Sequence, residues 1–160
     1  MEPRVPPEHE AIDERAKDYA VRTFQWLTAT ENQPAGAERS ARDVISWFHM
    51  IIATKTDRAL TIWPGEDDED DEFDNDGSAK VALLAIDESH AAWLDLIDQH
   101  IVSRAEADSF IADLVWLGEA LEGVRPKARA FVRPGFDEPD AVARFLGFYP
   151  QRGGRPSTLS

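Results

Sequence analysis

The chain of 160 residues contains no cysteine. Disulfide bonds and thiolate metal ligands are therefore excluded, which agrees with a reducing compartment. The sequence also lacks long hydrophobic runs: the longest, VALLAI at residues 81–86, is far shorter than the roughly 20 residues that cross a bilayer. The opening stretch, MEPRVPPEHE, contains no apolar signal-peptide core. We therefore expect a cytoplasmic protein that does not enter a membrane.

Clusters of basic residues are missing as well. The 17 Lys and Arg residues are outnumbered by 31 Asp and Glu residues, which gives a formal net charge of −14. Duplex nucleic acid and anionic lipid surfaces repel such a chain, because binding them requires a cationic face. We therefore expect no duplex nucleic acid and no membrane among its partners. The hydrophobic share of 42% is nevertheless sufficient for one packed core in a chain of this length.

Four segments of the chain place apolar residues at helical spacing. They cover residues 8–30, 40–62, 78–100 and 103–123, and the last is closed by Gly123 with Pro126. Capping boxes, Ser40 with Asp43 and Ser103 with Glu106, precede the second and fourth segments. No segment alternates with the period of a strand. The sequence therefore predicts an all-α fold, an antiparallel helical bundle of about four long helices in one domain, residues 1–150.

Aromatic residues are frequent after the fourth segment. Residues 139–146 predict a short C-terminal helix, and the Phe and Tyr side chains around it predict a strap that needs a surface to cover. Residues 151–160 predict a disordered tail. Trp47, Met50 and Trp116 project away from the expected core and offer such a surface. Two explanations remain open: the strap packs on the back of the bundle, or these residues form the interface of a homodimer.

A polar cluster is expected inside the bundle. His90 lies at the centre of the apolar stripe of the third segment, and Asp87 lies one turn earlier on the same face. Lys55 lies within the apolar face of the second segment at a matching distance from the connecting turn. We expect Lys55, Asp87 and His90 to form a buried cluster that fixes the register of the two helices. The alternative is half of a metal site, because carboxylate-bridged bundles use a similar spacing of acid and histidine.

The second segment also contains the stretch RDVISWFH, from Arg42 to His49. It resembles the motif of HEPN-type ribonucleases, an Arg followed by a polar residue and, after four to six intervening residues, a His. The resemblance covers these eight residues only. It implies a helical, usually dimeric protein in which Arg42 and His49 cleave RNA near the dimer interface. Seven positions are nearly two helical turns, so the two side chains are expected on one face.

The most acidic stretch, EDDEDDEFDNDGSAK, occupies residues 66–80. An acidic loop over residues 65–77 is expected to join the second and third helices. Its carboxylates are those of Glu66, Asp67, Asp68, Glu69, Asp70, Asp71, Glu72, Asp74 and Asp76. The part from Glu72 onward is spaced like a calcium loop, but Leu83 stands where that loop needs a bidentate Glu. The loop is therefore either a solvated connection or a docking site for a basic protein.

These features favour a protein without catalytic activity that acts in protein interaction or regulation. We expect no metal and no cofactor, a protein partner of basic character, and a homodimer as one possible assembly. The enzyme alternatives are a HEPN-like ribonuclease that uses Arg42 and His49, and a metal-dependent bundle around Asp87 and His90. On the fourth helix Asp113 and Glu119 are expected to face outward by periodicity, so neither is predicted to contribute to a site.

Overall fold

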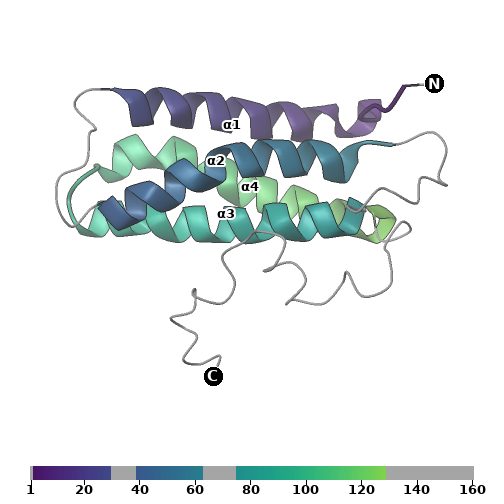
Figure 1. Cartoon of the computed structure of the whole chain (residues 1–160). Coiled ribbons are helices and arrows are strands. Elements are labelled where there is room, and N and C mark those ends of the chain that lie inside the picture. Colours follow the sequence, from purple (N-terminus) through teal and green to yellow (C-terminus); the bar gives the residue numbers. More distant parts are fainter. Residues whose placement is uncertain (1, 30–38, 63–74, 129–160) are drawn as a thin grey trace.

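The computed structural model describes residues 2–29, 39–62 and 75–128. A 3-10 turn, η1 (Pro7–His9), precedes four long helices: α1 (Glu10–Thr28), α2 (Arg39–Leu60), α3 (Asn75–Asp98) and α4 (Arg104–Ala128). Successive helices run in opposite directions, and α1 and α3 each pack against both α2 and α4 (Figure 1). The predicted antiparallel bundle is confirmed. The predicted strap, short C-terminal helix and tail lie outside the described residues, and so do the eight acidic residues from Glu66 to Asp74.

The core is formed by one face of each helix, and an aromatic cluster lies near its middle. The rings of Trp93 on α3 and Phe110 on α4 are stacked, with centroids 4.4 Å apart. The indole nitrogen of Trp93 donates a hydrogen bond of 3.1 Å to the hydroxyl of Tyr19 on α1. Both Tyr19 and Trp93 are completely buried. The cluster therefore joins three helices while satisfying the polar atoms that it buries.

The buried face of α3 differs from the predicted stripe. Ile86 and Trp93, which share the predicted apolar stripe with His90, are buried, but His90 is only half-buried. The face that packs inward also contains small residues, among them Ala82, Ala85, Ser89 and Ala92. Small side chains allow two helix axes to approach closely, and α3 makes its most extensive contact with α2. The prediction gave most weight to the large residues of the pattern and therefore rotated the helix by about one position.

The beginnings of the helices agree with the capping signals to different degrees. At α4, the backbone N–H of Glu106 donates to Ser103 Oγ at 3.0 Å, so the predicted cap at Ser103 is confirmed. The carboxylate of Glu106 accepts a hydrogen bond of 3.0 Å from the indole nitrogen of Trp26 on α1. The helix α2 begins at Arg39, which places Ser40 inside its first turn rather than at its cap. A local signal therefore located each start to within about one residue.

The end of α4 was predicted too early. Gly123 and Pro126 were expected to close this helix, but it continues to Ala128. Arg125 lies between these two residues and forms an ion pair with Asp76 on α3. This contact holds the last turn of α4 against α3, so a tertiary interaction outweighs the unfavourable local propensity.

The turn between α3 and α4 reverses the chain at His100, which has a φ of 61°. The N–H of Ile101 donates to the carbonyl of Leu96, and the N–H of His100 donates to that of Ile97. These two bonds form a Schellman motif, which satisfies carbonyl groups at the end of a helix. Glycine is the usual residue at this left-handed position, because it has no Cβ to clash with the backbone. His100 therefore occupies a strained site.

Candidate binding site at one end of the bundle

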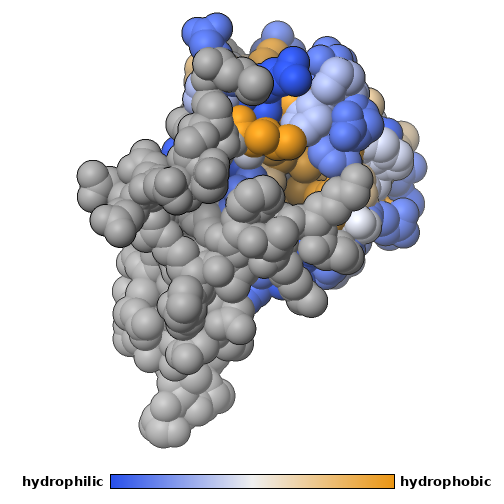
Figure 2. Space-filling view, turned by 90° about the vertical axis from the view of Figure 1, so that its right-hand side faces the viewer, coloured by the Kyte–Doolittle hydropathy of each residue, from blue (hydrophilic) through white to orange (hydrophobic). Residues whose placement is uncertain are grey.

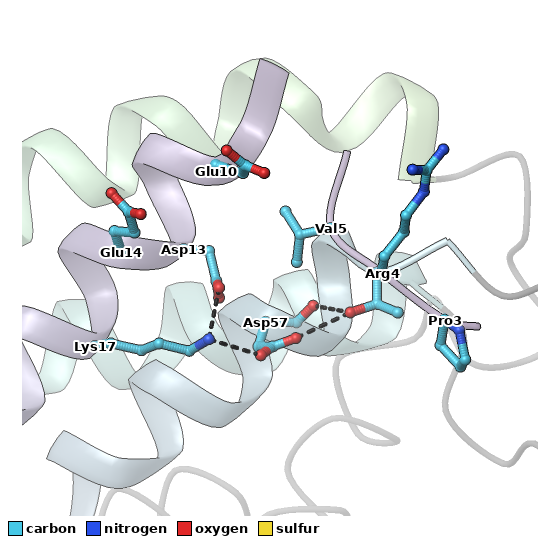
Figure 3. A pocket seen from close by; sticks show the side chains of 9 residues that line it. Pro3, Arg4, Val5, Glu10, Asp13, Glu14, Lys17 and Asp57 are labelled. Atoms are coloured by element: carbon cyan, nitrogen blue, oxygen red, sulfur yellow. Dashed lines mark hydrogen bonds and ion pairs between the residues drawn. The ribbon is translucent and has the colours of Figure 1, made fainter. Parts of the chain in front are cut away.

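A pocket lies where the N-terminal arm crosses the end of the bundle (Figure 3). The arm is held by two backbone hydrogen bonds between Arg4 and Ile62, of 2.8 and 3.2 Å. The first turns of α1 and the end of α2 form the other walls, and the volume is about 610 Å³. The pocket is lined by Pro3, Arg4, Val5, Glu10, Asp13, Glu14, Lys17, Asp57 and Thr61. Four carboxylates in this lining face two cationic groups.

Lys17 joins the two helices across the pocket. Its ammonium group lies 2.7 Å from Asp13 Oδ2 and 3.2 Å from Asp57 Oδ2 (Figure 3). The hydrogen bond from Lys17 to Asp13 raises the pKa of Lys17 above its usual value, with a smaller contribution from Asp57 in the same direction. Asp57 is held in turn by the hydroxyl of Thr61, which donates to Asp57 Oδ1 at 2.9 Å. The pocket therefore already stabilises one primary ammonium group.

Asp13 has a feature that this ion pair does not explain. The residue is only 6% exposed, although it lies in the first turn of α1. Its Oδ2 is bonded to Lys17, whereas its buried Oδ1 has no hydrogen-bond partner in the part of the chain that the structure describes. A buried carboxylate oxygen without a donor costs free energy. The sequence pattern did not single out Asp13, because one acid in the first turn of a helix is common.

Asn75 closes the same end of the bundle on the side of α3. Its side-chain amide donates to the backbone oxygens of Arg58, Ala59 and Thr61, at 3.2, 2.9 and 2.8 Å. The first two oxygens belong to the last turn of α2 and the third to Thr61 just beyond it, where carbonyls have no partner inside the helix. A residue predicted to lie in the acidic loop is therefore the first residue of α3 and a cap for α2.

Asp76 was also assigned to the acidic loop, and this assignment is wrong. It lies in the first turn of α3 and is 1% exposed. Its Oδ1 accepts a hydrogen bond of 3.0 Å from Arg125 Nε, and Lys80 Nζ lies 3.8 Å from its Oδ2. This bond to Asp76 raises the pKa of the Arg125 guanidinium. Asp76, which the sequence spacing placed in a calcium-like loop, is therefore part of a structural ion pair with Arg125.

The end of the bundle that contains the pocket is shown in Figure 2, which views the molecule from the right-hand side of Figure 1. Hydrophobic surface lies there beside hydrophilic surface. Ile62 is 51% exposed at this end, and Val5 is half-buried in the wall of the pocket. The site therefore combines carboxylates with apolar groups that can contact the stem of a long side chain.

No protein-family model, no curated protein and no solved structure matched the chain. The chemistry of the site therefore has to be argued from its residues. Within residues 2–29, 39–62 and 75–128, there is no group of three or more His, Asp or Glu residues arranged to hold a metal ion. The same ranges contain no helix with the length and apolar character needed to cross a bilayer.

Arg42 and His49 lie on one face of α2, as the motif required, and both contact α1. A guanidinium nitrogen of Arg42 donates to the backbone oxygen of Leu27, and the group lies over the ring of Trp26. His49 is 8% exposed; its Nδ1 lies 2.6 Å from the carbonyl oxygen of Ser46, and its ring is stacked against that of Phe24. These contacts give both side chains a role in the packing of α1 on α2.

The predicted polar cluster of Lys55, Asp87 and His90 is not buried. Asp87 is exposed, and His90 and Lys55 are each half-buried. Partial burial lowers the pKa of Lys55, and the nearby charge of Arg58 acts in the same direction. Because the buried face of α3 is rotated relative to the prediction, Asp87 lies on its solvent side. The cluster is therefore not a core ion pair.

A buried polar cluster exists elsewhere, between α1 and α4. Asp113 was expected to face outward but is 7% exposed. Its Oδ1 lies 2.9 Å from Arg15 Nε, and its Oδ2 contacts the guanidinium of Arg22. The sequence contained a signal for this cluster, because Asp113 lies three positions after Phe110 and four before Leu117, on the apolar face of the helix.

The predicted interface residues have different surroundings. Trp47 and Met50 are 55% and 53% exposed, so they project away from the core as expected. Trp116 is half-buried, and the guanidinium of Arg15 lies 4.5 Å from the centre of its ring. On α1, Val21 and Phe24 are also more than half exposed. Exposed apolar side chains are therefore contributed by α1 and α2, and on α4 by Val115, which is 44% exposed, rather than by Trp116.

Proposed function

We propose that this protein is a binding module without catalytic activity that docks a basic protein partner at the pocket end of the bundle. The observation that supports it most is the pocket itself, where four carboxylates outnumber two cations and the buried Asp13 Oδ1 has no donor among the described residues. A cationic group from a partner would supply both the missing charge and the missing hydrogen bond.

The connection that contains the acidic residues 66–74 is flanked on both sides by described residues at the pocket end of the bundle. The residue before this connection is Ile62, which is bonded to Arg4, and the residue after it is Asn75, which is bonded to the end of α2. The connection from 63 to 74 carries eight acidic residues in the sequence. Such a concentration of charge raises the rate at which a basic partner associates, more than it raises the affinity of the complex.

The test is recovery of partners from the native host with two forms of the full chain. One form is intact, and the other carries Glu→Gln and Asp→Asn substitutions from Glu66 to Asp74. Substitution is preferable to deletion because a shorter connection could displace Asn75 and Asp76, which hold the start of α3 against the end of α2 and against α4. We expect the intact chain to recover a basic protein and the neutralised chain to recover less of it. At high salt neither chain should recover it, because salt screens exposed charges.

Two controls make this result specific. Thermal unfolding of the neutralised chain is measured beside that of the intact chain, and similar midpoints would show that the substitutions leave the fold intact. Asp18→Asn removes a charge from α1 at a position paired with Arg22, away from the pocket, and should leave recovery unchanged. An identical set of partners with the intact and neutralised chains would contradict the proposal.

A further inference from the structure

The pocket favours one kind of group over other cations. Asp13 Oδ1 is buried beside an ion pair that uses only the other oxygen of the carboxylate. Glu10 and Glu14 follow one another at a spacing of one helical turn and are exposed at the rim. A ligand that donates hydrogen bonds to the carboxylates of Asp13, Glu10 and Glu14 together must present several N–H groups in different directions.

A guanidinium group has that property. It carries five N–H donors in a planar fork, and it is more weakly hydrated than an ammonium group, so less free energy is lost when it approaches a buried oxygen. The aliphatic stem of an arginine can also lie along Val5, the apolar member of the pocket wall. An ammonium group would offer three donors at one point and compete directly with the position of Lys17.

Lys17 acts as an internal occupant of the site. Its side chain is 54% exposed, yet its ammonium group bridges two carboxylates on different helices. It neutralises part of the charge that a ligand would contact, and it keeps Asp13 Oδ2 occupied. Removal of Lys17 would therefore make the site more acidic and leave more carboxylate oxygens for a ligand.

We propose that the pocket is a binding site for one arginine side chain of the partner, with the Asp13 carboxylate as its principal acceptor and Lys17 as an internal competitor. This inference rests on the proposed function, since it names the group through which the basic partner is recognised. The contribution of Asp13 to partner affinity can then be measured separately from that of the acidic residues 66–74. The two substitutions at the site are expected to change affinity in opposite directions.

The test uses the full chain with the acidic residues from Glu66 to Asp74 neutralised, so that general attraction is small. The probe is a fluorescent arginine-rich peptide, compared with the same peptide containing lysine. Asp13→Asn should weaken binding of the arginine peptide about tenfold, the size of one charged hydrogen bond. Lys17→Met should strengthen it several-fold. The lysine peptide should bind more weakly and respond less to Asp13→Asn.

Matched controls separate the site from net charge. Asp18→Asn makes the same change as Asp13→Asn on the same helix, and Arg104→Met removes a cation at the opposite end of the bundle, where α4 begins (Figure 1). Both should alter affinity less than twofold. Unfolding cannot produce the gain expected for Lys17→Met, so a folding defect in Asp13→Asn would not imitate the whole pattern.

The results distinguish the two proposals. Equal losses for Asp13→Asn and Asp18→Asn, or a loss for Lys17→Met, would overturn the arginine site while leaving the acidic docking function to its own test. If Asp13→Asn weakens peptide binding but host partners do not depend on the acidic residues, the arginine site stands and the docking role of residues 66–74 fails. Similar affinities for both peptides would contradict the preference for a guanidinium group.

Discussion

Asp76 on α3 and Arg125 on α4 form a hydrogen-bonded ion pair, with the carboxylate 1% exposed and Arg125 Nε 3.0 Å from its Oδ1. The pair joins the first turn of one helix to the last turn of another. A second charged group, Glu122, lies 3.5 Å from Arg125 but is largely exposed. The two acids thus offer a comparison between a buried and an exposed partner of the same arginine.

Asp76→Asn should lower the free energy of unfolding by about 3 kcal/mol, because it leaves the mostly buried Arg125 without its buried charged partner. Glu122→Gln should change it by about 0.5 kcal/mol or less, since exposed ion pairs contribute little. Urea denaturation followed by circular dichroism measures both values. Equal effects of the two substitutions would show that burial of Asp76 does not determine the strength of the pair.

Asn75→Ala should lower the free energy of unfolding by about 1 to 2 kcal/mol, because two carbonyls in the last turn of α2 and that of Thr61 lose their shared amide donor. Gln99→Ala is a suitable control, since Gln99 carries the same amide group exposed beyond the other end of α3. Denaturation of both variants gives the comparison. If Asn75→Ala lowers the free energy of unfolding no more than Gln99→Ala does, Asn75 does not act as a cap for α2.

His100→Gly should raise the free energy of unfolding by about 0.5 to 1 kcal/mol. The left-handed conformation at φ 61° is strained for His, and Gly adopts it without strain, although Gly also increases the entropy of the unfolded chain. Gln99→Gly is the neighbouring control and should lower stability, because position 99 lacks a positive φ. A decrease for both variants would mean that the turn is not strained at His100.

Stability should fall as pH rises above about 10, because burial raises the pKa of Tyr19 above its usual value of 10.0. The unfolded chain then loses the Tyr19 proton while the folded chain keeps it, so deprotonation favours unfolding. Tyr19→Phe should reduce this alkaline loss of stability. A titration of the Tyr149→Phe variant by ultraviolet absorbance isolates the Tyr19 signal, and ionisation of Tyr19 at its ordinary pKa would contradict the expectation.

The sequence predicted the number, order and approximate bounds of the helices, because amphipathic spacing and caps are local signals. Ser103 is an example, since its hydroxyl and the amide that it caps are three residues apart. The rotation of α3 was missed because Ala82 and Ala85 contribute to the core through close approach of α2 rather than through size. A pattern of large residues does not contain that information.

The candidate site could not be predicted from local sequence patterns. Asp13, Lys17 and Asp57 come from two helices, and their contact depends on how α1 packs on α2. Asn75 and Asp76 looked like the end of an acidic run until their partners at the end of α2 and on α4 were known. The acidic character of the connection and the exposure of Trp47 and Met50, in contrast, could be predicted directly from residue type and spacing.

The most direct test of the proposed binding end is to add the arginine-rich peptide to the isotope-labelled full chain and to follow backbone amide signals by nuclear magnetic resonance. The account predicts that the largest changes occur at Asp13, Lys17 and Thr61, and that Asp13→Asn reduces them. Residues of the distant turn, such as His100, should keep their positions. Changes centred on that turn, or spread evenly over all four helices, would contradict the account.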